Sequence, residues 1–156
     1  MSLEKNKTII RRYTEACNKK DSALLDELVA PDYFHPVFQL RGREAYKQFE
    51  TMLWKAFPDW NETIEDITAE EDKVWYRMKI TGTHVGELHF PAPSGKMMTL
   101  APTGKKFTMT GVSIKRIVDG KIVESWAVYD MLDFYKQLGV IEYTEKTKKL
   151  FPESAT

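Results

Sequence analysis

Two strand-like runs near the end of the chain narrow its possible folds more than any other feature. The runs are 107–118 and 121–130, and Asp119-Gly120 joins them. Asp-Gly is a preferred pair for a two-residue type I′ turn, so the runs predict a β-hairpin.

A two-residue turn also predicts the register of this hairpin. The expected pairs are 118 with 121, 115 with 124, 113 with 126, 111 with 128, and 109 with 130. Lys115 then lies opposite Glu124 as a cross-strand ion pair, and the small residues Gly111 and Ser113 leave room for large partners. The same register places Asp130 at the end of an apolar face that carries Met109, Gly111, Ile122, Trp126 and Val128.

The first third of the chain has the periodicity of helices. Apolar residues recur at helical spacing around Ile9 and Tyr13, and Asp21 is a predicted N-cap for a short second helix that Pro31 stops. A third helix is predicted from about Arg43 to Pro58. A final short helix over 131–138, with Gly139 as its C-cap, follows the hairpin.

Between these parts the spacing of the apolar residues changes from that of a helix to that of a strand. Residues 73–84 alternate, with Val74, Tyr76, Met78, Ile80, Gly82 and His84 on one face. Residues 85–106 are rich in Pro and Gly and predict a long, partly irregular loop. Helices followed by long strands predict an α+β fold with the helices across the concave side of a curved sheet.

Composition argues against a protein that binds nucleic acid or spans a membrane. The 156 residues carry 23 basic and 23 acidic side chains, so no overall field attracts nucleic acid or an anionic membrane. We expect a cytoplasmic location, because Cys17 is the single cysteine and no run is apolar enough for a membrane span or a signal peptide. The length predicts one domain over 1–156, with a core of about 5–139 and a charged tail over 140–156.

Several segments together resemble a known family. They are YFHP (33–36), FPDW (57–60), ITGTHVGE (80–87), APTGKK (101–106) and GVSIKRIVDGKIVESWAVYDMLDFYKQLG (111–139). Their order and spacing resemble the SnoaL-like polyketide cyclases of the nuclear transport factor 2-like (NTF2-like) superfamily. Residues 88–100 form an insertion relative to that pattern.

The resemblance implies a cone-shaped NTF2-like fold with a deep, mostly apolar cavity, and a homodimer formed through the outer face of the sheet. It also implies ring closure by intramolecular aldol condensation without a metal or a cofactor. The acid/base aspartate of that family lies in a W-x-x-x-D arrangement, which Trp126 and Asp130 match. The family's histidine on the preceding strand has no counterpart here, where Lys115 and Arg116 stand.

Two roles are open for Asp130. In an apolar cavity its pKa would rise, and it could then serve as both base and acid of an aldol closure. It also directly precedes the final helix, where a carboxylate can cap free N–H groups.

Other candidate residues have similar alternatives. His84 and His35 either assist Asp130 in the cavity or hydrogen-bond locally at a strand end and in a loop. The predicted substrate-binding wall comprises Phe34, Trp54, Phe57, Trp60, Met109, Trp126 and Val128, each of which also suits plain core packing. The spacing of the three histidines fits no compact metal motif.

These residues support three interpretations of function. The first is a cofactor-free cyclase, isomerase or dehydratase that acts on a small hydrophobic carbonyl compound. The second is a small-molecule binding module with a catalytically silent cavity. The third, an epoxide hydrolase on the same fold, needs a second inward acid near Asp130, which the predicted hairpin lacks.

Overall fold

A six-stranded curved sheet forms the framework of the fold. The structure is a computed structural model that describes residues 2–91 and 97–150. Its elements are α1 (Leu3–Lys19), α2 (Ser22–Leu28), β1 (Val29–His35), β2 (Leu40–Arg41), α3 (Arg43–Ala56), β3 (Asn61–Glu70), β4 (Lys73–Thr83), β5 (Leu88–Pro91), β6 (Met97–Leu100), β7 (Lys106–Val118), β8 (Lys121–Tyr129), α4 (Met131–Gln137) and α5 (Glu145–Leu150).

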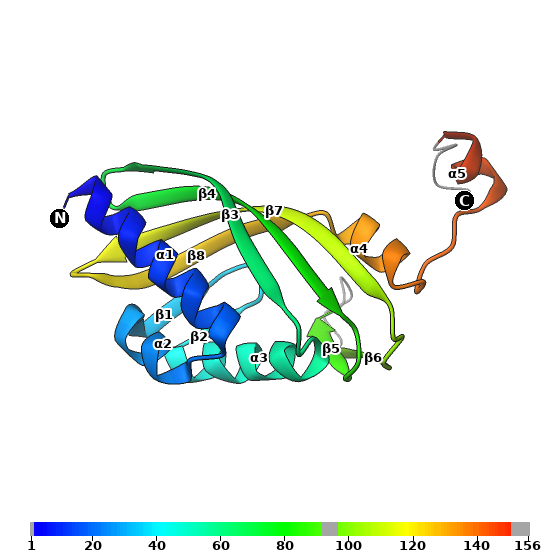
Figure 1. The fold of residues 1–156 in the computed structure, drawn as a ribbon, viewed down its shortest axis with the longest axis horizontal. Coiled ribbons are helices and arrows are strands. Elements are labelled where there is room, and N and C mark those ends of the chain that lie inside the picture. Colours follow the sequence, from blue (N-terminus) through cyan, green and yellow to red (C-terminus); the bar gives the residue numbers. More distant parts are fainter. Residues whose placement is uncertain (1, 92–96, 151–156) are drawn as a thin grey trace.

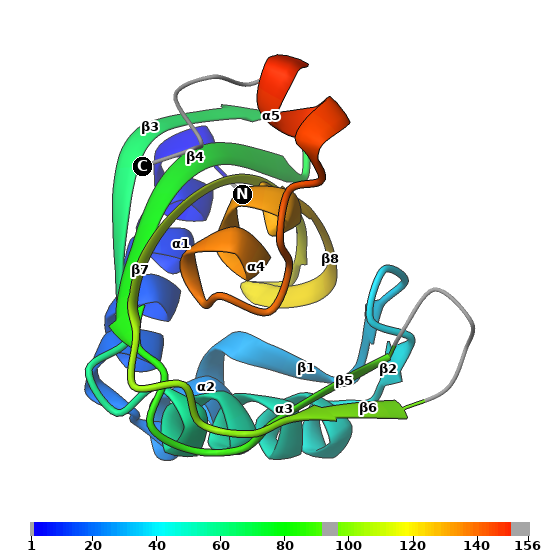
Figure 2. The same ribbon diagram turned by 90° about the vertical axis from the view of Figure 1, so that its right-hand side faces the viewer.

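The strand order in the large sheet is β2-β1-β8-β7-β4-β3. All neighbours are antiparallel except β1 and β8, which are parallel. Figures 1 and 2 show that the long strands curl around one end of the molecule, where α4 lies within the curl. Helix α1 packs on β3 and β4, and α3 packs on β1. The α+β, cone-shaped architecture expected from the sequence is therefore confirmed.

The predicted helices are present near their expected bounds. Asp21 caps α2 by accepting a hydrogen bond from the Leu24 N–H at 2.9 Å. Helix α3 begins at Arg43 and ends two residues before Pro58, as the pattern predicts. Helix α4 ends at Gln137, and Gly139 follows the cap residue with a φ of 70°, which suits a glycine.

The β7–β8 hairpin turns where predicted but departs from the predicted register. Val118 pairs with Lys121, and Asp119 and Gly120 have φ angles of 49° and 80°. Ile117 then pairs with Ile122, whereas Arg116 pairs with Glu124, so Val123 is an extra residue in β8. This β-bulge shifts all later pairs by one position.

The shift reverses the faces of the residues that follow it in β8. Side chains alternate across a strand, so an extra residue sends the remaining ones to the opposite side. Ser125 and Ala127 are buried, whereas Trp126 is 52% exposed and Val128 is 76% exposed. The expectation that Trp126 and Val128 face inward is therefore wrong.

The small residue Gly111 does leave room for a large neighbour, but not for the one predicted. Its partner is Tyr129, and a Cβ at position 111 would lie 2.6 Å from Cδ1 of that ring. The ring of Tyr129 therefore occupies the space that a side chain on residue 111 would need.

Several elements have no counterpart in the prediction. Strands β1, β2 and β3 occupy stretches for which no strand was expected. The predicted loop over 85–106 contains the antiparallel pair β5–β6, while residues 92–96 of the insertion lie outside the described residues. Helix α5 lies in the charged tail, away from the sheet (Figure 1).

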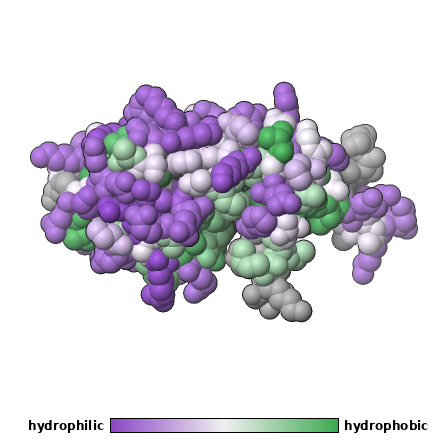
Figure 3. Space-filling view, turned by 90° about the horizontal axis from the view of Figure 1, so that it is seen from below, coloured by the Kyte–Doolittle hydropathy of each residue, from purple (hydrophilic) through white to green (hydrophobic). Residues whose placement is uncertain are grey.

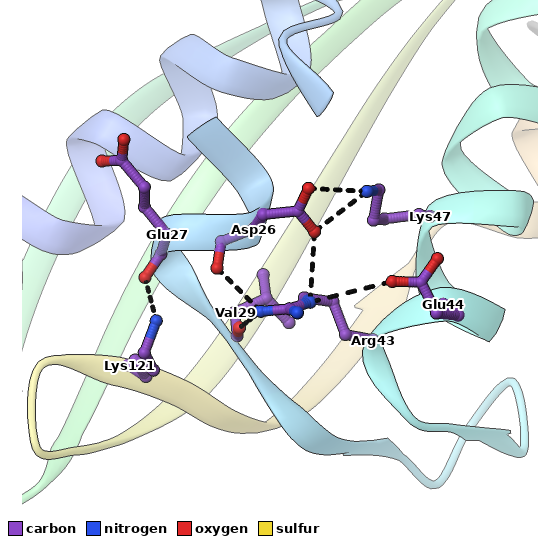
Figure 4. A network of polar contacts seen from close by, with 7 residues as sticks. All are labelled: Asp26, Glu27, Val29, Arg43, Glu44, Lys47 and Lys121. Atoms are coloured by element: carbon purple, nitrogen blue, oxygen red, sulfur yellow. Dashed lines mark hydrogen bonds and ion pairs between the residues drawn. The ribbon is translucent and has the colours of Figure 1, made fainter. Parts of the chain in front are cut away.

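A polar network joins α2 to α3 and to the hairpin turn (Figure 4). The Asp26 carboxylate contacts Lys47 Nζ at 2.8 Å and Arg43 Nε at 3.1 Å. Arg43 also donates to the carbonyl oxygens of Asp26 and Val29, at 2.8 and 3.3 Å. Lys121 at the hairpin donates to the carbonyl of Glu27 at 2.6 Å. These contacts set the position of α3, which supplies part of the cavity described below.

Hydrophilic side chains cover most of the face shown in Figure 3, with smaller hydrophobic areas between them. Such a mixture is ordinary for a protein surface. Within 2–91 and 97–150, no helix is both long and apolar enough to cross a membrane.

We expect Gly111→Ala to lower the free energy of unfolding by about 1–3 kcal/mol, because the new methyl group overlaps the ring of Tyr129. Denaturant unfolding would measure the loss. Thr110→Ala, on the exposed face of the same strand, is the matched control and should be nearly neutral. Equal stability of the two variants would contradict the close approach of the Tyr129 ring to residue 111.

Candidate functional site: a buried acid, amine and phenol cluster

A cavity of about 120 Å³ lies among α1, α3, α4 and the inward side of the sheet. A single water needs only about 10–15 Å³ on this scale, so the space suits a small organic group. Its apolar wall includes Phe38, Phe49, Leu53, Phe57, Trp60 and Met109. Its polar wall includes Tyr13, Tyr46, Glu50, Glu62, Tyr76 and Lys115.

Glu50 is a carboxylate on the inner face of α3. It lies one helical turn after Tyr46, whose hydroxyl donates to Glu50 Oε1 at 2.6 Å. The hydroxyl of Tyr13 is hydrogen-bonded to that of Tyr46, so two phenols lead to one carboxylate. Burial raises the pKa of Glu50 to about 7, against the weaker opposite effects of Tyr46 and Lys115.

Lys115 is a buried amine on β7. Strand alternation places it inward with Ser113 and Ile117, and 4% of it is exposed. Its Nζ donates to Ser125 Oγ at 3.0 Å and lies 4.2 Å from the centre of the Tyr13 ring. The bulge therefore replaces the predicted Glu124 partner by a neutral hydroxyl.

Burial also lowers the pKa of Lys115 below its ordinary value of 10.5, against the opposing effect of Glu62. Glu124 instead pairs with Arg116, Nε to Oε2, at 3.4 Å. The cross-strand ion pair predicted for Lys115 is therefore wrong.

Glu62 on β3 is the second acid of the cavity. It accepts a hydrogen bond from Thr14 Oγ1 at 3.2 Å, and burial raises its pKa above the ordinary value of 4.5. Asn18 holds the backbone at this point, because its side chain bonds both the N–H and the carbonyl of Glu62. Helix α1 thereby positions the acid that β3 carries.

Four of the residues predicted from the sequence line the cavity. They are His35, Phe57, Trp60 and Met109. Burial lowers the pKa of His35 to about 4, so its imidazole is neutral near pH 7. Its Nδ1 is buried and has no hydrogen-bond partner among the described residues.

Six other predicted residues are not part of the cavity wall: Val128 is exposed on β8, Asp130 is described below, and the remaining four follow here. His84 is fully buried behind Phe57, with its Nδ1 3.1 Å from Thr103 Oγ1, so the local hydrogen-bonding alternative describes its contacts. Trp54 packs against the core. Phe34 lies on the other face of β1 from the buried Tyr33 and His35, with the Arg41 guanidinium 4.3 Å from its ring centre. Trp126 donates from Nε1 to Glu124 on the outer face.

Asp130 is an exposed helix cap rather than an inward carboxylate. Its Oδ1 accepts a hydrogen bond from the N–H of Asp133 at 3.1 Å, at the start of α4. The expected position opposite Met109, facing the cavity, is wrong because the bulge at Val123 reverses the phase of β8. Tyr129, one residue earlier, lines the cavity instead.

Sequence reasoning missed Glu50 and Lys115, although each left a signal. Glu50 falls on the apolar stripe of its helix, four residues after Tyr46, and Lys115 shares the parity of Gly111 and Ser113. A charged residue on an inward face is rare unless it has a partner or a function. In the described part of the chain, no group of three or more metal-ligating side chains is arranged to hold a metal ion.

The fold and the cavity define an α+β protein of the NTF2-like type. A model of the SnoaL-like polyketide cyclase family matches residues 7–138. The chain belongs to this family, as the segments singled out in the sequence predict.

Known relatives agree with this assignment. The chain is 33% identical over 138 residues to aklanonic acid methyl ester cyclase DauD from Streptomyces sp. (strain C5), covering 84% of this chain and 80% of that protein. The structure of TsrD from Streptomyces laurentii is similar with a TM-score of 0.77 and 25% identity, over 90% of this chain and 99% of that one. The structure of IdmH from Streptomyces antibioticus is also similar, with a TM-score of 0.69 and 31% identity. The match covers 86% of this chain and 98% of that one.

The raised pKa of Glu50 predicts a pH-dependent stability. The folded state binds the proton more tightly than the unfolded chain, so this contribution is complete below pH 4.5 and is lost as the pH rises to about 7. Relative to Glu50→Gln, the free energy of unfolding of the wild type should fall by on the order of 3 kcal/mol across that pH range. Urea unfolding of both proteins at pH 4.5, 6 and 8 would measure the difference, and a constant difference would contradict the buried carboxylate.

Proposed function

We propose that the protein is a cofactor-independent polyketide cyclase in which Glu50 is the acid/base. The observation that carries this proposal is the buried Tyr13–Tyr46–Glu50 chain at the cavity wall. An acid/base works best when its pKa lies near the operating pH, and that of Glu50 lies at about 7.

Glu50 has the properties that an intramolecular aldol closure requires. Its carboxylate would take a proton from a C–H beside a carbonyl, and the resulting enolate carbon would attack a second carbonyl of the same substrate. The new alkoxide would then take the proton back from Glu50. The sum is an isomerisation, which needs no redox partner and returns the enzyme unchanged.

Phenols on the cavity wall would stabilise the negative oxygen of the enolate. Tyr76 and Tyr129 line the same cavity, and burial raises the pKa of both, so they stay protonated and able to donate. Preorganised donors in a water-poor site stabilise a developing oxyanion more than water does. The apolar wall formed by residues such as Phe49 and Leu53 would enclose a hydrophobic carbonyl compound.

We propose an ester of a polyketide acid as the substrate class. The support comes from the relatives, which include cyclases of aklanonic acid methyl ester and of nogalonic acid methyl ester. These two esters are therefore the first compounds to test.

We expect Glu50→Gln to lower kcat by about 10²–10⁴-fold with either ester, because the amide cannot accept the proton. Asp130→Asn is the control, since asparagine also caps helices and the exposed carboxylate is not among the groups that line the cavity. Product formation followed by liquid chromatography would measure both.

Full activity of Glu50→Gln together with loss in Asp130→Asn would return the acid/base role to Asp130. If wild-type protein binds the esters in calorimetry but never converts them, the binding-module alternative holds instead.

We further propose that the protein is a homodimer through the outer face of β7 and β8. Val112 pairs with Val128 and Ile114 with Trp126 on this face, and three of these four side chains are exposed. Exposed apolar side chains gathered on one sheet face are typical of interfaces between subunits.

We expect Val128→Glu to convert a dimer into a monomer, because it places a charge in the centre of this face. Sedimentation equilibrium would give the mass of both proteins. Thr110→Glu, on the same side of β7 but outside the apolar group, should leave the mass unchanged. A wild type that sediments as a monomer would contradict the proposal.

We propose a cytoplasmic location as well. Cys17, the single cysteine, is free and buried, which suits a reducing compartment. Fractionation of the source cells would test this location, and recovery in an extracellular fraction would contradict it.

A further inference from the structure

Lys115 is a buried group that the proposed acid/base step does not use. In the described ranges it is the one lysine with a buried side chain, and it lines the same cavity as Glu50. Among these residues its Nζ has one hydrogen-bond partner, Ser125 Oγ at 3.0 Å. No carboxylate of residues 2–91 or 97–150 forms an ion pair with it. An ammonium has three N–H donors, so this side chain keeps donor capacity for a ligand.

The contacts of Lys115 suit a positive charge. Its Nζ lies 4.2 Å from the centre of the Tyr13 ring, and the negative face of an aromatic ring attracts a cation. The hydroxyl oxygen of Ser125 accepts a hydrogen bond from the ammonium. Burial lowers the pKa of Lys115, and the attraction of Glu62 and Glu50 opposes that effect. The cavity therefore holds a cation that has no carboxylate in direct contact.

The charge of Lys115 acts on the other titratable groups of the cavity. Burial raises the pKa of Glu50 and of Glu62, and the charge of Lys115 opposes this rise for both acids. Burial, and then the same charge, lower the pKa of His35 to about 4, so the imidazole is neutral. Burial raises the pKa of the Cys17 thiol, which therefore stays protonated. Negative charge in this space thus belongs to the two acids or to a ligand.

We propose that the ammonium of Lys115 stabilises the negative oxygen of the substrate enolate. This inference rests on the proposed aldol function and assigns the group that balances its charge. When Glu50 takes a proton from carbon, negative charge leaves the carboxylate and appears on the substrate oxygen. A fixed cation in the same cavity balances the charge before and after this transfer. Lys115 itself neither gains nor loses a proton, and the proton on Glu50 returns to the alkoxide of the closed ring.

The buried cation also restricts the kind of ligand that the cavity takes. An apolar wall with one unpaired ammonium among the described residues favours a hydrophobic compound that becomes negative on one oxygen. A compound with a C–H between two carbonyl groups has this property, because loss of that proton leaves the charge on a carbonyl oxygen. The reacting part of the substrate is therefore expected to be a 1,3-dicarbonyl group.

The test uses 4-nitrophenol, a small aromatic alcohol whose ionised form is yellow and, like an enolate, is negative on oxygen. It is bound to Glu50→Gln, because the amide resembles the protonated acid and removes the competing carboxylate. Absorption spectra over a range of pH give the midpoint at which the bound dye ionises. This midpoint should lie about 1–3 pH units lower in Glu50→Gln than in Glu50→Gln/Lys115→Met, because a nearby cation favours the phenolate.

Two controls separate the charge of Lys115 from its packing. Lys79→Met in the Glu50→Gln protein removes an exposed lysine of β4, so it changes the net charge equally and should leave the midpoint unchanged. The methyl ether 4-nitroanisole cannot ionise, and its Kd should be the same for all three proteins if the cavity is intact. An equal midpoint with and without Lys115 would overturn the proposal.

NMR of Glu50→Gln tests the same charge if the lysine variant fails to fold. With ¹⁵N-labelled lysine side chains, the spectrum counts the protons on Nζ, and the ring current of Tyr13 distinguishes the signal of Lys115. We expect three protons at neutral pH, and a shift of this signal with ionised 4-nitrophenol that 4-nitroanisole does not cause. Two protons on Nζ, or an equal response to both compounds, would overturn the proposal.

Kinetics with the esters give a readout that a purely structural lysine would not move. Lys115→Met should lower kcat by about 10²–10³-fold, the usual cost of removing a group that stabilises an oxyanion. Without the cation the pKa of Glu50 rises further, so the increase of kcat with pH should move to higher pH. Lys79→Met should change neither quantity.

The outcomes also separate this inference from the proposed function. If the wild type converts aklanonic acid methyl ester, Glu50→Gln does not, and the midpoint of the bound dye ignores Lys115, the cyclase function stands and the role of the ammonium is wrong. If Lys115 lowers the midpoint while neither ester is converted, the anion-stabilising site stands and the proposed substrate class is wrong.

Discussion

The hydrogen-bonded ladder between β7 and β8 determines which side chains reach the cavity. β7 keeps one phase along its length, so Met109, Ser113 and Lys115 all face inward. β8 changes phase at Val123, so Lys115 meets Ser125 and not Glu124. In the regular register the lysine would lie opposite the carboxylate of Glu124. A single extra residue therefore leaves a buried amine beside a neutral hydroxyl.

Desolvation then controls the protonation of the groups that share this space. It raises the pKa of Glu50 and Glu62 and lowers that of Lys115, because each charged form loses water that the cavity does not replace. Attraction between the acids and the amine opposes these shifts without cancelling them. Burial therefore shifts the pKa of the acids and the pKa of the amine in opposite directions. The fold supplies the cavity, and these particular side chains form its polar wall.

Much of the fold follows from local patterns, and the site follows from them less well. Helices α2 and α3 and strand β4 form where the caps and the spacing of apolar residues predict them. The Asp119-Gly120 turn also forms where expected. Strand β1 was missed because its partner β8 lies about 90 residues away, and no local pattern specifies that pairing. His35, Phe57, Trp60 and Met109 reach the cavity as predicted. Asp130 does not reach the cavity, because one bulge in β8 moves the later side chains to the opposite face. The sequence of the turn does not reveal that bulge.

By itself, the sequence determined the order of the predicted helices and strands and the position of the hairpin turn, because both depend on short-range conformational preferences. It also determined the family, because the resemblance depends on the order and spacing of short segments. Asp130 at the start of the last helix was already a potential cap by its position alone. Only the tertiary structure decided that Asp130 caps α4 while Glu50 and Lys115 line one cavity. The physical reason is that burial and strand phase are set by partners distant in the chain, and they decide which charges lose their water.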